Sequence, residues 1–133
     1  MNKLIGHLIA IKHYAKGLHY AYYGDTFYGN HLLMDLVADG VDGFIDDIKE
    51  DIILARGYKP LNAKEYLAMA INVMPDINKE ERYNTSLLKD LINKTVEHIN
   101  GMNNLSKGDE NLIGAIAQKL QKAQGLLNLY LEA

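Results

Sequence analysis

Residues 19–57 read HYAYYGDTFYGNHLLMDLVADGVDGFIDDIKEDIILARG, and this stretch carries the strongest indication of how the chain folds. Two histidines and three carboxylates in it are candidate metal ligands: His19, His31, Asp35, Asp46 and Glu50. The gaps between them are 12, 4, 11 and 4 residues. A gap of four places two side chains one turn apart on the same face of a helix. Two imidazoles and three carboxylates suit a metal such as iron, which changes between oxidation states.

The separation of the two i, i+4 pairs restricts how such a site can form. His31 and Glu50 would lie about 28 Å apart along a continuous helix, at about 1.5 Å per residue. Side chains at that distance cannot bind one metal ion within a single helix. Either the helix breaks, or a second copy of the chain completes the site.

The composition predicts a single domain over residues 1–133. Apolar residues make up 48% of the chain, which is typical of a globular protein with one core. The sequence has no cysteine, no secretory pattern after Met1 and no apolar run long enough to span a membrane, so we expect a cytoplasmic protein. A net charge of −3 gives no electrostatic reason to expect binding to nucleic acid.

Apolar residues recur at steps of three and four along most of the chain, which predicts an all-α fold. The pattern predicts helices over residues 3–22, 27–55, 78–100 and from 106 onward, with a short helix near 63–70. Thr26 would cap the second helix, and Ser106 with Asp109 would form a capping box for the last. The expected architecture is a four-helix bundle with a long crossover between its second and third helices.

A helical wheel over residues 27–55 separates two faces. With His31 at zero, Asp35, Asp46 and Glu50 fall within a sector of about 100°. The residues expected to face the bundle lie elsewhere on the wheel: Leu33, Val37, Val41, Phe44, Ile48 and Ile52. The candidate ligands therefore point away from their own core, and His19 can fold back beside His31.

Apolar residues also occur on the outward side of this helix. Leu32 and Leu36 lie next to the candidate ligands, which suggests that another surface covers this face. A twofold axis near the middle of the helix would bring His31 of one chain close to Asp46 and Glu50 of the other. Such a contact would form the site twice, once at each end of the interface.

Simpler interpretations remain open at this point. A polar stripe on a long helix is usually its solvated face, and an isolated histidine is more often structural than a metal ligand. The sequence has no Glu-x-x-His pair, no His-Glu-x-x-His motif and no glycine-rich phosphate loop. Ser86 and Ser106 have helix or cap contexts that do not support a nucleophile. His7, His13 and His98 lack a carboxylate at consistent spacing and are interpreted as structural or surface residues.

The stretch from residue 19 to 57 resembles the Dps family, the mini-ferritins of the ferritin-like superfamily. That family has a histidine, a glycine five residues later, a phenylalanine eight later and a second histidine twelve later. An aspartate follows after four residues, then an Asp-x-x-x-Glu pair and a glycine at the helix end. Here those positions hold, without insertion or deletion, His19, Gly24, Phe27, His31, Asp35, Asp46, Glu50 and Gly57.

The resemblance implies a function. Dps-like proteins form homo-oligomeric shells of twelve subunits, bind Fe(II) at sites shared across the twofold interface, oxidise it preferentially with hydrogen peroxide and store ferric mineral. By this resemblance the chain is expected to be a ferroxidase active in oxidative stress, with Zn(II) as a possible surrogate metal. His19, His31 and Asp35 would come from one subunit, and Asp46 and Glu50 from its partner.

The sequence departs from the Dps pattern at several positions, and these departures leave a second function open. Tyr20-Ala21 replaces the usual Trp-Asn after the first histidine, and Asp47 and Asp51 double the acidic pair. Tyr20 and Asp47 would lie next to the metal ligands. The sequence shows no Lys/Arg-rich extension, so DNA binding is not expected. The alternative function is a Dps-fold structural shell, or a protective or packaging protein, with little oxidase activity.

Overall fold

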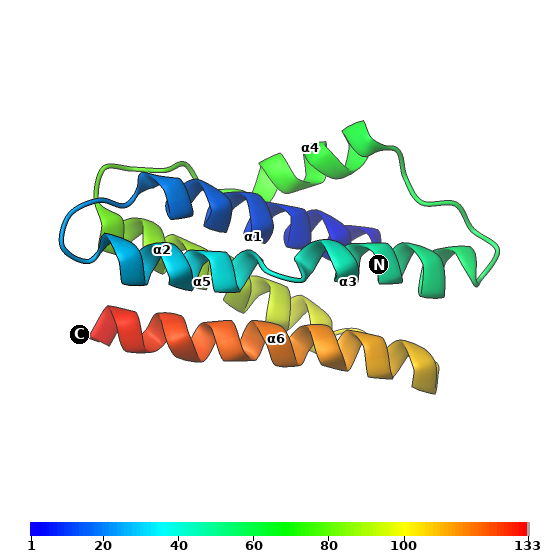
Figure 1. Cartoon of the computed structure of the whole chain (residues 1–133). Coiled ribbons are helices and arrows are strands. Elements are labelled where there is room, and N and C mark those ends of the chain that lie inside the picture. Colours follow the sequence, from blue (N-terminus) through cyan, green and yellow to red (C-terminus); the bar gives the residue numbers. More distant parts are fainter. Residues whose placement is uncertain (133) are drawn as a thin grey trace.

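The computed structural model describes residues 1–132, which contain helices and no strand. In chain order the elements are α1 (Asn2–Ala21), α2 (Phe27–Ala38), α3 (Val41–Asp47), the π-helix η1 (Ile48–Leu54), α4 (Ala63–Val73), α5 (Glu81–Asn100) and α6 (Lys107–Glu132). Figure 1 shows a bundle in which α1, α5, α6 and the row formed by α2, α3 and η1 are its four long members. The helix α4 lies in the crossover and packs on α1. The predicted four-helix bundle with a long crossover is confirmed.

The core forms around α1, which contacts α2, α4 and α5. The apolar residues of α1 recur at helical steps and are almost completely buried: Leu4, Leu8, Ile11, Ala15 and Leu18. At Gly6 the helix α4 approaches so closely that an added Cβ would lie 2.7 Å from the Cβ of Met69. The short helix therefore covers one side of α1 through a contact that only glycine permits.

The predicted continuous helix over residues 27–55 is wrong. The helix α2 ends at Ala38, and Gly40 adopts a left-handed φ of +75° before α3 begins at Val41. Glycine reaches this φ without the steric penalty of a Cβ atom. Figure 1 shows α2 and α3 following one another in the same general direction. The helical wheel assumed one continuous helix, so its angles between residues before the break and residues after it do not apply.

Side-chain caps explain several helix boundaries. The Ser106 hydroxyl accepts the Asp109 N–H at 3.1 Å, which confirms one half of the predicted capping box of α6, whereas the Asp109 carboxylate pairs with Arg56 instead of returning a hydrogen bond to Ser106. The helix α5 begins at Glu81 rather than near residue 78. The side-chain amide of Asn84 donates to the Asn78 carbonyl at 2.7 Å and accepts the Asn78 N–H at 2.8 Å, which holds that segment outside the helix. Within residues 1–132, no helix combines the length and apolar character needed to cross a membrane.

Candidate metal centre

The turn between α1 and α2 brings two histidines together. His19 lies in the last turn of α1 and His31 in the second turn of α2. Gly24, with a φ of +88°, reverses the chain between them. The two imidazole rings stack with centroids 3.4 Å apart and an interplanar angle of 20°. The expected position of His19 beside His31 is therefore observed.

Reciprocal hydrogen bonds fix how these rings are presented. The Nδ1 atom of His19 lies 2.6 Å from the His31 carbonyl oxygen, and Nδ1 of His31 lies 2.6 Å from the His19 carbonyl oxygen. A carbonyl oxygen only accepts, so each Nδ1 carries the hydrogen. In the neutral rings both Nε2 atoms then hold a free lone pair. Metal-binding histidines commonly have this arrangement, with the second nitrogen held by a carbonyl or carboxylate.

Aromatic side chains surround the pair on two sides. The Tyr20 ring meets His19 edge-on at a centroid distance of 4.8 Å, and Phe27 lies 4.8 Å from His31. The Tyr20 side chain is 75% exposed, whereas His19 is buried. The imidazoles thus lie at a partly shielded edge of the bundle rather than in open solvent.

A lysine binds the nearest candidate carboxylate. The Lys16 ammonium lies 2.5 Å from Oδ1 of Asp35. This hydrogen bond and the charge of Lys16 hold the pKa of the Asp35 carboxyl below its usual value, with smaller contributions from His19 and His31. The same contact raises the pKa of the Lys16 ammonium. Asp35 is ionised near neutral pH, and a metal that uses it must compete with Lys16.

The other two candidate ligands lie beyond the helix break. Asp46 is near the end of α3 and Glu50 is in η1, and both are exposed, as are Asp47 and Asp51. Between residues 1 and 132, no three histidine or acidic side chains converge to hold a metal ion. The helix break therefore does not bring Asp46 and Glu50 to the histidines of the same chain. The π-helix that carries Glu50 is a rare form often found at functional sites.

Sequence reasoning missed the role of Lys16. A signal was available, because Lys16 precedes His19 by three residues and side chains three apart lie on neighbouring positions of one helix face. The partner of Lys16 on the next helix depends on how the turn places α2 against α1. That placement is a tertiary feature that local spacing does not specify.

A solved structure shares this arrangement of helices. A mutant form of Mycobacterium smegmatis Dps1 superposes with a TM-score of 0.78 over 98% of this chain and 91% of that chain, at 19% sequence identity. The chain has the Dps fold. A scan against models of protein families gives no match. A search among curated proteins gives no match either. The likeness to Dps1 is therefore one of fold, within the ferritin-like class of helical bundles.

Proposed function

We propose that this chain is a Dps-like ferroxidase that oxidises Fe(II), preferably with hydrogen peroxide, and stores the ferric product in a homo-oligomeric shell. The observation that carries the proposal is the stacked pair His19 and His31, in which Nδ1 of each ring is bound to the carbonyl of the other residue, so that Nε2 is the nitrogen each ring can offer to a metal. Asp35 lies on the same side, one turn after His31. The Dps fold supports storage or protection as the general role.

A shared site would explain where the remaining ligands lie. Asp46 and Glu50 are exposed and do not converge with the imidazoles of their own chain. Leu32 on α2 is 48% exposed, which leaves apolar surface next to the histidines, whereas Leu36 faces α6. A partner related by a twofold axis would cover this surface and bring its own Asp46 and Glu50 to the imidazoles.

The ligand chemistry fits iron as the substrate. Neutral imidazole nitrogens accommodate Fe(II), and carboxylates favour the harder Fe(III). In the overall reaction two Fe(II) ions each lose one electron, and one hydrogen peroxide molecule takes up both electrons and two protons to give two water molecules. Consuming peroxide in this way limits one-electron reactions with free iron that release hydroxyl radical. Zn(II) would bind the same donors without a redox change.

The proposal is tested by complementation between two inactive variants. His31→Ala and Glu50→Ala should each severely reduce Fe(II) oxidation by peroxide while far-UV circular dichroism stays unchanged. Co-assembly of the two variants should restore activity, because a mixed twofold dimer has one intact and one doubly defective site. Random pairing makes about half of the dimers mixed, so about a quarter of all sites should recover. His13→Ala and Asp51→Ala, both at exposed positions, are the matched controls.

Two outcomes would contradict the shared ferroxidase site. Verified mixed dimers that recover no activity would mean that the ligands do not combine across the interface. Wild-type activity in both single variants would mean that these residues do not carry the oxidation. Little activity in the wild type itself would favour the second candidate, a Dps-fold structural shell or protective protein with little oxidase activity. The ion pair between Lys16 and Asp35 favours that candidate, since it already neutralises one of the five expected ligands.

A further inference from the structure

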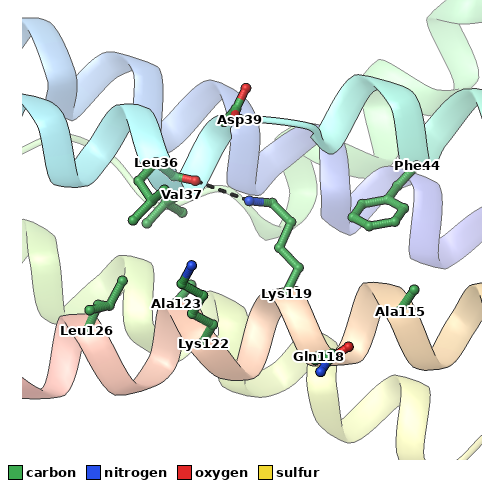
Figure 2. A pocket seen from close by; sticks show the side chains of 10 residues that line it. All are labelled: Leu36, Val37, Asp39, Phe44, Ala115, Gln118, Lys119, Lys122, Ala123 and Leu126. Carbon is green, nitrogen blue, oxygen red and sulfur yellow. Dashed lines mark hydrogen bonds between the residues drawn. The ribbon is translucent and has the colours of Figure 1, made fainter.

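A cavity of about 620 Å³ lies between α6 and the row formed by α2 and α3, as Figure 2 shows. Its size falls within the range of pockets that bind small molecules, roughly 300–1,000 Å³. Most of its walls are apolar: Leu36, Val37, Phe44, Ala115, Ala123 and Leu126. None of the five candidate iron ligands lines it, so it is separate from the proposed metal centre.

The helix break lies at this cavity. Leu36 is in the last turn of α2, where carbonyl oxygens lack a helical partner. The Lys119 ammonium reaches across from α6 and donates to the Leu36 carbonyl at 3.1 Å. A cationic side chain thus caps the C-terminus of α2, where the helix dipole favours positive charge.

The charges around the cavity are not balanced. Burial lowers the pKa of the Lys119 ammonium, the charge of Asp39 opposes this decrease, and the charge of Lys122 adds a smaller decrease. Among residues 1–132, no carboxylate lies within salt-bridge distance of either lysine. Figure 2 shows both ammonium groups directed from α6 into the space below α2. Two ammonium groups and one carboxylate, Asp39, line the cavity, and Lys119 donates to a neutral carbonyl, so one positive charge remains that an anion can balance.

We propose that this cavity binds a small amphipathic anion, a monocarboxylate with a medium-length aliphatic tail. The carboxylate accepts hydrogen bonds from Lys119 and Lys122, which relieves the repulsion between the two ammonium groups. The tail packs against Leu36 and Leu126 and removes their apolar surface from water. Inorganic phosphate fits less well because apolar walls would leave several of its oxygens without partners.

Titration calorimetry on the full-length protein in its native assembly tests this, with sodium octanoate as the probe. Octanoate should bind, whereas 1-octanol and sodium phosphate should give no measurable heat of binding at the same concentrations. Lys119→Met should weaken octanoate binding by at least about tenfold, as expected for the loss of a charge-assisted hydrogen bond. Lys64→Met changes an exposed lysine of α4 outside the cavity and should leave the affinity unchanged.

A second variant keeps the test decisive if Lys119→Met unfolds. Leu126→Ala retains both lysines and shortens the apolar wall, so it should weaken octanoate binding several-fold. Three results would overturn the proposal: no binding of octanoate to the wild type, equal binding of octanol and octanoate, or wild-type affinity in both cavity variants. None of these results depends on iron, so they leave the proposed ferroxidase function untouched.

Discussion

A second histidine pair predicts a pH dependence of stability. His7 on α1 and His98 on α5 stack with ring centroids 5.9 Å apart and an interplanar angle of 22°. The Thr95 hydroxyl donates to the Leu91 carbonyl at 2.8 Å, so it accepts from Nδ1 of His7, which lies 3.0 Å away. The Nε2 atoms of both histidines are buried and have no hydrogen-bond partner among the described residues.

Every charged neighbour of this pair disfavours protonation. Burial lowers the pKa of His7, and the positive charges of His98, Lys3 and Lys94 lower it further. Burial also lowers the pKa of His98, with Lys3 and the N-terminal amine acting in the same direction. Both rings are therefore neutral in the folded chain at a pH where the unfolded chain has begun to bind protons.

The sign and size of the effect follow from linkage. Below the unfolded pKa of 6.5 the unfolded state takes up protons that the folded state does not, so the free energy of unfolding falls as pH falls. The loss continues until the pH reaches the lowered folded pKa. Each histidine contributes a loss of at most about 1.4 kcal/mol between about pH 7.5 and about pH 5.5, a limit reached only if it stays neutral, so the pair contributes at most about 2.7 kcal/mol.

Urea unfolding followed by far-UV circular dichroism measures this loss at fixed protein concentration, since association is linked to stability. The double variant His7→Gln and His98→Gln should lose less stability than the wild type over the same pH interval, by up to about 2.7 kcal/mol. His13→Gln, at an exposed position of α1, should behave like the wild type. An equal loss in the wild type and the double variant would refute the reasoning.

Three further predictions concern the proposed function. Lys16→Met should free the Asp35 carboxylate and strengthen Zn(II) binding by up to about fivefold in titration calorimetry, and weaker binding with an intact fold would contradict this. Sedimentation should find a particle of about 180 kDa, twelve copies of the 15.0 kDa chain, and a stable monomer at micromolar concentration would contradict the shared site. With a net charge of −3, the protein should give no duplex DNA shift in a gel at physiological salt, and a tight, salt-sensitive complex would overturn this.

The helical content could be predicted because apolar periodicity survives in each helix. The break after α2 could not, because buried Val37, Val41 and Ile45 continue the four-residue spacing across it. The pair Asp39-Gly40 was a local signal for a break, because glycine permits the left-handed backbone. The continuous apolar spacing favoured an unbroken helix and outweighed this signal. A π-helix gives no comparable signal, since buried Ile48, Ile52 and Ile53 suit either helix type.

The two histidine pairs differ in how far they can be predicted. His19 and His31 are 12 residues apart with a turn between them, so a reversal of the chain is enough to bring them together. His7 and His98 are 91 residues apart, and their contact depends on how α5 packs against α1. The sequence indicates only structural or surface roles for these two, and their burial and stacking are consistent with a structural role.

Histidine thus has different electrostatic surroundings at the two ends of α1. At His19 and His31 the backbone carbonyls hold Nδ1, and the ionised carboxylate of Asp35 lies on the adjoining turn. At His7 and His98 all the charged neighbours that shift the pKa values are cationic. Near the first pair the Asp35 carboxylate is balanced by the Lys16 ammonium, so a divalent cation meets little net charge there, whereas the ammonium groups around the second pair repel it. Charge in the immediate surroundings, more than the presence of histidine, therefore favours the first pair over the second as the proposed metal-binding site.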